Sequence, residues 1–194
     1  MASDKRKIAI FASGSGTNAE KFFEKFQDHS LAEVSLLLTN NPKAGAIARA
    51  ERFGIPVKIF DRSTFIQTDQ IVHHLQEIGI DFIVLAGFMW LVPINLIKAF
   101  PNRMVNIHPA LLPAYGGKGM YGMYVHQAVM EAGEKVTGIT IHYVNEKYDE
   151  GQIIFQARCD IAPGDTPEDI ADKVHALEYQ YYPKVVEDLI KNIE

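Results

Sequence analysis

The stretch KIAIFASGSGTN, residues 7–18, decides the fold class of this 194-residue sequence. Its first half, Lys7–Ala12, is a short apolar run of the kind that forms a strand buried on both faces. Its second half, Ser13–Asn18, is rich in glycine and hydroxyl side chains, and the helical spacing of phenylalanines in Ala19–Phe26 follows at once. A buried strand, a glycine turn and a helix in this order predict an α/β protein with a parallel sheet.

The alternation of apolar strands and helices continues along the chain. Further buried strands are expected at Val34–Leu38, Val57–Phe60, Phe82–Ala86 and Met104–Ile107, and helices at Ala44–Phe53 and Thr64–Ile78. A glycine follows each of the two helices, as is typical of helix ends.

The pattern changes after residue 136. Thr137–Val144 and Gln152–Ile161 are strand-like runs joined by a short polar segment, which predicts an antiparallel pair. A last helix is expected from Thr166 to about Ile190, with a near capping box at its start and a bend near Pro183. The prediction is one domain, residues 1–194, with a mostly parallel sheet, helices on both faces and an antiparallel C-terminal strand pair.

Charge and composition exclude several classes of function. The chain has 24 acidic and 19 basic residues, a formal net charge of −5, and no basic stripe, which argues against a nucleic-acid partner. Its most apolar stretch, Phe82–Ile97, is interrupted by Gly87 and Pro93 and is too short to span a membrane. Because residues 1–4 are polar and resemble no signal peptide, we expect a cytoplasmic protein.

Cysteine and histidine usage argues against disulfides and metals. The single cysteine, Cys159, excludes an internal disulfide, and we expect it to be buried in the core. No cluster of Cys and His has the spacing of a metal site, so no metal is expected.

The glycine loop, residues 13–18, has two interpretations. It is either a phosphate cradle built from backbone amides and the donors of Ser15, Thr17 and Asn18, or a tight turn with helix caps. A dinucleotide site is disfavoured because the second strand ends Leu38-Thr39-Asn40-Asn41, without the acidic residue that would hold a ribose.

A second polar group lies at the end of the strand Met104–Ile107. Asn106 and His108 are two residues apart, so both side chains point to the same side, at the sheet edge where ligands bind. Asp149, in a polar turn, could fold back toward His108 and raise the pKa of the imidazole. Asn106 would then supply a neutral donor for a developing oxyanion, which suits attack on an acyl carbon.

The chain resembles the folate-dependent phosphoribosylglycinamide formyltransferases over nearly its whole length. The resemblance is carried by Ser13-Gly14-Ser15-Gly16-Thr17-Asn18, Leu85-Ala86-Gly87-Phe88-Met89, Asn106-Ile107-His108-Pro109-Ala110-Leu111-Leu112-Pro113, Asp149-Glu150-Gly151 and Glu178. It implies a Rossmann-like formyltransferase fold and transfer of formyl from 10-formyltetrahydrofolate to the amine of glycinamide ribonucleotide, by a monomer or homodimer that uses no metal. The oxyanion would be held by Asn106 and His108, and the proton would reach the folate nitrogen through His108 or an ordered water.

The resemblance also implies roles for individual residues. Asn106, His108 and Asp149 match the catalytic set, with Asp149 tuning His108. The residues implied for the ribonucleotide are Ser15, Gly16, Thr17, Asn18, His175 and Glu178. Those implied for the folate are Met89, Trp90, Leu91, Val92, Asn106, Asn145, Glu146, Lys147, Tyr148 and Asp149, with Arg62 as the candidate substitute for an arginine common in the family. The glycine-rich segment 115–124 looks longer than usual, and we expect a mobile flap there.

Two alternatives stay open at this point. Other folate-dependent formyltransferases share the Asn-His-Asp chemistry, although the tRNA-modifying and hydrolytic relatives carry extra domains. A non-enzymatic module could use the glycine loop to bind a nucleotide phosphate, but it would leave Asn106, His108 and Asp149 without a role.

Overall fold

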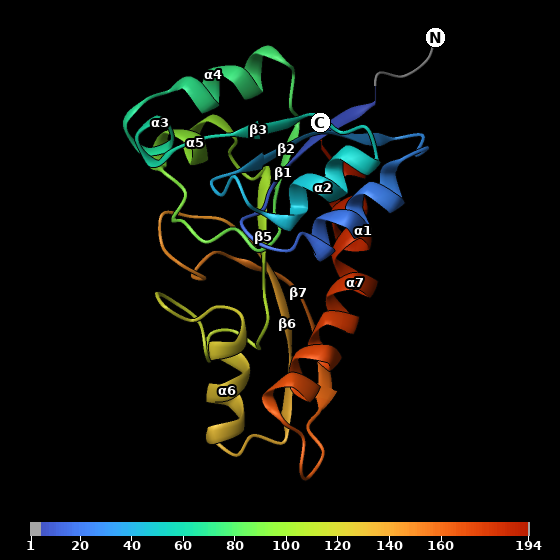
Figure 1. Ribbon diagram of the computed structural model, residues 1–194, viewed down its shortest axis with the longest axis vertical. Coiled ribbons are helices and arrows are strands. Elements are labelled where there is room, and N and C mark those ends of the chain that lie inside the picture. Colours follow the sequence, from blue (N-terminus) through green and yellow to red (C-terminus); the bar gives the residue numbers. More distant parts are fainter. Residues whose placement is uncertain (1–4, 194) are drawn as a thin grey trace.

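The computed structural model describes residues 5–193, and one seven-stranded sheet runs through the molecule (Figure 1). The strands are β1 Arg6–Phe11, β2 Ala32–Thr39, β3 Val57–Ile59, β4 Phe82–Leu85, β5 Met104–His108, β6 Val136–Tyr143 and β7 Ile153–Asp160. The helices are α1 Thr17–Phe26, α2 Gly45–Arg52, α3 Arg62–Gln67, α4 Gln70–Glu77, α5 Ile94–Ala99, α6 Met123–Glu131 and α7 Pro167–Lys191.

The sheet has the order β3-β2-β1-β4-β5-β6-β7. The first five strands of this order pair in parallel, whereas β5 pairs with β6 and β6 with β7 in antiparallel fashion. The predicted fold class is therefore confirmed, including the antiparallel C-terminal strand pair.

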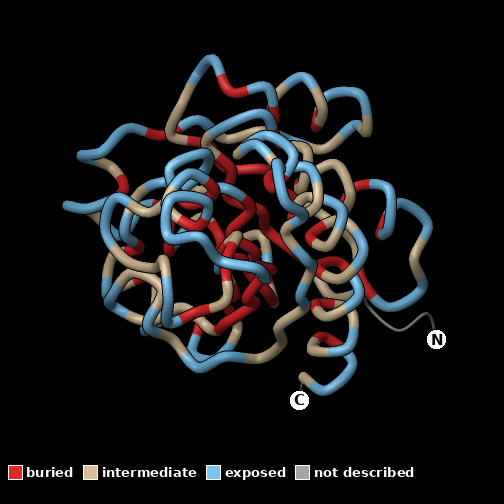
Figure 2. Tube along the Cα trace, turned by 90° about the horizontal axis from the view of Figure 1, so that it is seen from below, coloured by how far each residue is buried: buried red, intermediate tan, exposed pale blue. Residues whose placement is uncertain are grey.

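Helices cover both faces of the sheet, as the continuous apolar strands predict. Side chains of β1 alternate between the two faces: Ile8 and Ile10 pack in a core with α1, α2 and α7, and Ala9 and Phe11 pack in a second core with α3, α4 and α5. Figure 1 shows these two helix groups on opposite sides of the sheet, and Figure 2 shows the buried segments gathered at the centre of the molecule. None of the helices among residues 5–193 is long and apolar enough to cross a membrane.

The single helix predicted over Thr64–Ile78 is wrong. Two helices, α3 and α4, replace it, because Thr68 between them has an extended backbone with φ −134° and ψ 162°. The Thr68 hydroxyl satisfies both helix ends: it donates to the carbonyl of Thr64 at 2.8 Å and accepts from the amide of Gln70 at 3.3 Å. Because the Thr68 side chain replaces hydrogen bonds that the helix ends lose, the interruption between the two helices costs little free energy.

Other details also differ from the expectations. The sequence did not predict α5, and Cys159 is half-buried rather than buried because β7 is an edge strand of the sheet.

The last helix begins as expected, with the side chain and backbone of Thr166 and Asp169 exchanging both bonds of a capping box. It continues through Pro183 to Lys191 without interruption.

Tyr182 of α7 ties the helix to the two strands that lead into the site. Its side chain is fully buried, and its hydroxyl contacts the carbonyl oxygens of Leu85 at 2.9 Å and Val105 at 3.2 Å. Burial raises the pKa of this hydroxyl well above its usual value, so it stays a donor. The hydroxyl therefore satisfies polar groups that water does not reach.

Tyr182→Phe is expected to lower the free energy of unfolding by about 1–2 kcal/mol, because the buried carbonyl oxygens lose their donor. Urea denaturation measures the change. Tyr181→Phe is the matched control, since no hydrogen bond is recorded for that hydroxyl among residues 5–193. Equal stability of the two variants would contradict the role of the buried hydroxyl.

Candidate active site

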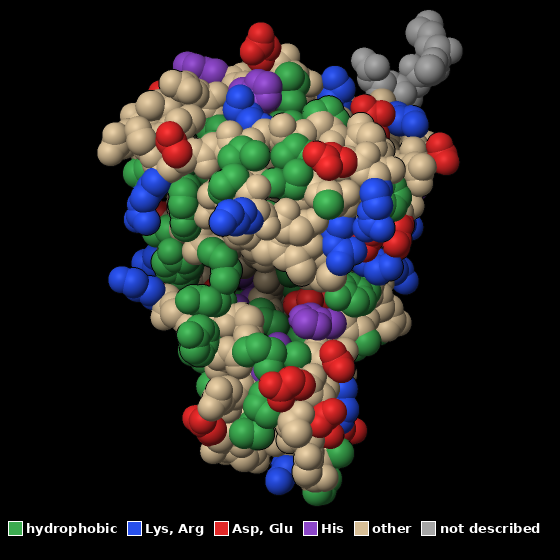
Figure 3. Space-filling model, viewed as in Figure 1, with side chains coloured by type: hydrophobic (Ala, Val, Ile, Leu, Met, Phe, Trp, Pro, Cys, Tyr) green, Lys and Arg blue, Asp and Glu red, His purple; other side chains and the backbone are tan. Residues whose placement is uncertain are grey.

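A cavity of about 530 Å³ opens at the carboxyl ends of β1, β4 and β5. Its lining consists of residues 14–18, 85–92, 106–109 and 117–122, parts of 142–149, and His126, His175 and Glu178. Figure 3 shows the hollow in the middle of the face, with histidine side chains in and beside it. The carboxyl edge of an open α/β sheet is the place where such folds bind ligands.

Asn106, His108 and Asp149 come together in this cavity, as the sequence predicts. The Nδ1 atom of His108 lies 3.4 Å from Oδ2 of Asp149, and the Nδ2 atom of Asn106 lies 3.4 Å from Oδ1. Strand β5 places Asn106 and His108 on the cavity side, and the turn after β6 brings Asp149 back over them.

Asp149 is held in an unusual backbone conformation, with φ +55°. Its Oδ2 atom accepts a hydrogen bond from the amide of Gly117 at 2.9 Å. Burial raises the pKa of Asp149, but the nearby imidazoles of His142 and His108 and the hydrogen bond from the Gly117 amide outweigh it, so the pKa lies below its usual value. The carboxyl group is therefore ionised at neutral pH.

The protonation of His108 differs from the sequence-based expectation. Asp149 favours the imidazolium, as expected, but the ring is 3% exposed, and this burial outweighs the carboxylate and lowers the pKa of His108. The Nε2 atom lies 2.7 Å from the carbonyl oxygen of Tyr115, so Nε2 carries the hydrogen. Nδ1 thus faces the carboxylate and gains an ion pair whenever it takes up a proton.

His142 was missed by the sequence analysis. Its Nδ1 atom lies 2.9 Å from the carbonyl oxygen of Tyr143, so Nδ1 donates and Nε2 is free to accept. Nε2 lies 3.3 Å from Nδ2 of Asn106 and 3.6 Å from Oδ1 of Asp149. The two contacts of the Asn106 amide, with His142 and with Asp149, are long, which leaves the amide able to turn toward a ligand.

His126 is a second buried histidine that the sequence analysis passed over. It is 1% exposed, lines the cavity, and has no hydrogen-bond partner for Nδ1 among the described residues. Burial, with the nearby His175 and His108, lowers its pKa to about 4. His126 is therefore neutral at physiological pH.

The glycine loop forms the other wall of the cavity. Gly16 has a left-handed backbone, with φ +76°, and a Cβ at this position would overlap Ala46 of α2. The Nδ2 atom of Asn18 donates to Oε2 of Glu178 at 2.8 Å, while Oδ1 of Asn18 is buried and has no hydrogen-bond partner within residues 5–193. Burial raises the pKa of Glu178, against the opposing effect of this hydrogen bond.

Ser13 connects the two walls. Its hydroxyl donates to Oδ1 of Asn40 at 2.7 Å and accepts from the amide of Met89 at 3.1 Å. Its own amide donates to the carbonyl oxygen of Gly87 at 3.0 Å. The loop after β1 and the loop after β4 are thus fixed relative to each other.

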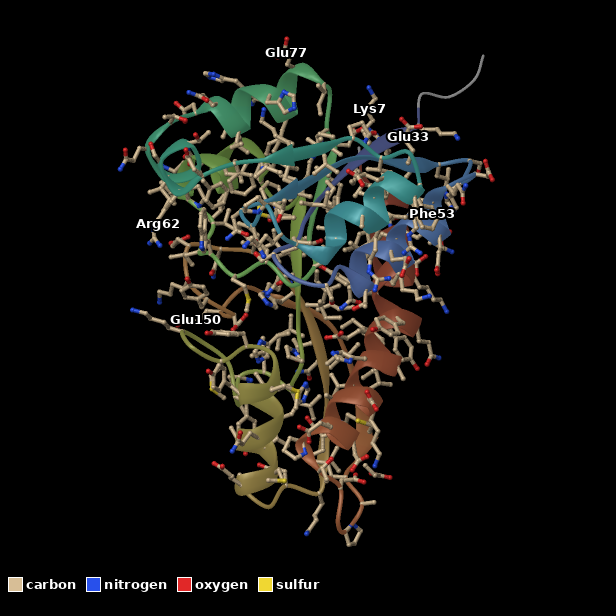
Figure 4. The ribbon with its side chains drawn as sticks, in the orientation of Figure 1. Lys7, Glu33, Phe53, Arg62, Glu77 and Glu150 are labelled. Carbon is tan, nitrogen blue, oxygen red and sulfur yellow. The ribbon has the colours of Figure 1, made fainter. Side chains whose placement is uncertain are left out.

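Most of the residues predicted for the folate line the cavity, but two do not. Glu146 is exposed, because Oδ1 of Asn145 accepts from the amide of Lys147 at 3.0 Å and turns the intervening residue outward. The guanidinium of Arg62 lies 5.7 Å from the ring centre of Trp90, outside the lining. Figure 4 shows Arg62 extending outward from the start of α3.

The α/β sheet thus places Asn106, His108 and Asp149 at its carboxyl edge, with the glycine loop opposite. Residues 6–186 match the formyl transferase family, and the chain belongs to this family. Its relatives include the phosphoribosylglycinamide formyltransferase of Bacillus subtilis, 37% identical over 95% of each chain.

Other relatives agree with this assignment. The crystal structure of phosphoribosylglycinamide formyltransferase from Bacillus halodurans is 40% identical, covers 97% of each chain and has a TM-score of 0.86. The chloroplastic phosphoribosylglycinamide formyltransferase of Arabidopsis thaliana is 44% identical over 94% of this chain. The chain spans 64% of the length of that plant relative and 61% of its counterpart from Vigna unguiculata.

Proposed function

We propose that the protein transfers the formyl group of 10-formyltetrahydrofolate to the primary amine of 5′-phosphoribosylglycinamide, in purine biosynthesis. The observation that carries the proposal is the convergence of Asn106, His108 and Asp149 on a cavity whose opposite wall is the glycine loop. A phosphate at the loop and a formyl carbon at Asn106 fit the two ends of one cavity. The family and the names of the relatives support the same reaction.

The proposed mechanism is direct attack of the substrate amine on the formyl carbon. Asn106 and His108 donate hydrogen bonds to the oxyanion of the tetrahedral intermediate. The intermediate collapses with cleavage of the bond to the folate nitrogen, and the proton that the attacking amine loses reaches this nitrogen through His108 or an ordered water. Asp149 orients the imidazole and stabilises its charged form.

The folate is proposed to bind beside Met89, Trp90, Leu91 and Val92, which line the cavity next to Asn106. Arg62, stacked on Trp90 from outside, would fix the indole rather than contact the bound pterin. The mobility expected of residues 115–124 stays a prediction, as do a cytoplasmic location and a monomeric or homodimeric state.

A spectrophotometric assay with 10-formyltetrahydrofolate and glycinamide ribonucleotide tests the function. Turnover that depends on both substrates is the expected result. Folded protein without turnover would contradict the proposal and would favour the alternative, a module that only binds a nucleotide phosphate. A formyl-folate hydrolase would instead release formate without the ribonucleotide.

Asn18→Ala is expected to raise the KM for the ribonucleotide roughly tenfold and the KM for the folate much less, since about one charge-assisted contact is lost. The substitution frees Glu178 from its hydrogen bond and shortens a side chain that lines the cavity. Steady-state kinetics with each substrate varied gives both constants. Asn95→Ala, outside the cavity lining, is the control, and a larger change in the folate KM would mean that the two pockets are assigned the wrong way round.

A further inference from the structure

Three consecutive carbonyl groups of the glycine loop, those of residues 13–15, all bond to the segment that follows β2. Their donors, in chain order, are Nδ2 of Asn41 at 3.1 Å, the amide of Ala46 at 3.2 Å and Nε of Arg49 at 2.9 Å. These donor residues do not belong to the lining of the cavity, whereas residues 14–18 do. The carbonyls are therefore turned toward the side of the loop that the ligand does not occupy.

This arrangement determines where the loop amides point. In a planar trans peptide the N–H group is directed opposite to the preceding carbonyl. With the carbonyls of residues 13–15 turned toward Asn41, Ala46 and Arg49, the amides of residues 14–16 are directed away from them, on the cavity side. None of these amides has a recorded hydrogen-bond partner among residues 5–193. Successive free amides that face one way form a concave site for an anion.

Arg49 is itself held firmly in place. Its guanidinium pairs with the carboxylate of Glu20 on α1, and Arg52 pairs with the same carboxylate. The loop packs directly on α2, since a Cβ on Gly45 would lie 3.0 Å from the carbonyl oxygen of Ser15. Arg49 thus joins α1, α2 and the loop without reaching the cavity.

Asn41 occupies the region where a dinucleotide-binding protein would carry its ribose-binding acid. Its Oδ1 atom accepts from the amide of Lys43 at 2.9 Å, which directs Nδ2 at the carbonyl of Ser13. The side chain after β2 therefore supports the loop instead of touching a ligand. This gives a structural reason for an amide at this position.

We propose that Arg49 and Asn41 are positioning residues for the phosphate of the substrate. They rotate the peptide planes of the loop so that the amides of residues 14–16 meet the anion, and Arg49 adds positive charge behind the Ser15 carbonyl. The inference rests on the proposed function, because it takes the substrate to be a phosphate monoester. It predicts that the two side chains affect recognition of the phosphate and not of the rest of the substrate.

The test measures binding of glycinamide ribonucleotide and of its dephosphorylated riboside by calorimetry, so it does not depend on turnover. Arg49→Gln is expected to weaken binding of the ribonucleotide roughly tenfold, because about one charge-assisted hydrogen bond is lost. Its affinity for the riboside should stay within about twofold of that of the wild type. Arg52→Gln is the matched control: it removes the other arginine on Glu20, keeps the Ser15 bond, and is expected to match the wild type.

Further variants separate geometry from charge and guard against misfolding. Arg49→Lys keeps the charge without the Nε donor, so the positioning role predicts weaker ribonucleotide binding here too. If thermal denaturation shows that Arg49→Gln does not fold, the same binding measurements are made on Asn41→Ala. This variant is also expected to bind the ribonucleotide more weakly and the riboside as the wild type does.

The outcomes distinguish the two proposals. Wild-type protein that does not bind the ribonucleotide contradicts the proposed function. Wild-type binding that Arg49→Gln leaves unchanged overturns the positioning role alone, and so does an equal loss for ribonucleotide and riboside, because that would reflect general damage to the loop.

Discussion

His108→Ala is expected to lower kcat by roughly 10²–10⁴-fold, the range of general acid–base and oxyanion contributions. His108 is buried, and its Nε2–H bonds to the Tyr115 carbonyl while Nδ1 faces Asp149. A substrate oxyanion that replaces the Tyr115 carbonyl would receive this hydrogen bond as negative charge develops. Because the interaction strengthens in the transition state, kcat should fall much more than either KM changes.

Single-turnover and steady-state kinetics on the same preparation measure this effect. His108→Gln is a useful second variant, since the amide can still donate a hydrogen bond but cannot titrate. It should recover part of the lost rate and should remove the pH dependence that belongs to the imidazole. His73→Ala, an exposed histidine of α4, serves as the control for loss of an imidazole elsewhere. A His108→Ala enzyme with nearly wild-type kcat would refute the assigned role.

The parts of the site that depend on short-range pattern were predictable from the sequence. The apolar strand and the spacing of two predict that Asn106 and His108 lie at one edge of the sheet. The glycine turn after β1 predicts that the glycine loop lies at the same edge. Parallel strands align their carboxyl ends, so local signals were enough to bring these segments together. The resemblance to a family then supplied the formyl group and the folate of the predicted reaction, neither of which spacing could indicate.

What the sequence missed depends on long-range register and burial. His142 reaches Asn106 because β5 and β6 pair these two residues directly, a register that no local pattern specifies. His126 reaches the cavity only because α6 packs against α7. The effect of the Asp149 carboxylate, which raises the pKa of His108, could be inferred from the sequence, whereas the extent of burial, which lowers this pKa overall, could not.

Asp149→Asn is expected to lower kcat by roughly 10²–10⁴-fold, since it removes the charge that stabilises protonated His108. Asparagine is the right replacement because it tolerates the left-handed backbone at this position, φ +55°, which would strain most other residues. It also retains an oxygen that can accept from the amide of Gly117. The variant therefore changes charge while the turn keeps its shape.

The pH profile separates this electrostatic role from a structural one. If protonated His108 is the proton donor, the rate falls as the pH rises through the pKa of His108. The Asp149 carboxylate raises that pKa and burial lowers it, so removal of the carboxylate lowers the pKa further and moves the falling limb to more acidic pH. Asp149→Asn should thus be most impaired at neutral and alkaline pH and should recover part of its activity on acidification. A limb that stays in place while kcat falls would show that Asp149 acts only by holding the turn, and a shift to higher pH would contradict the proposed coupling altogether.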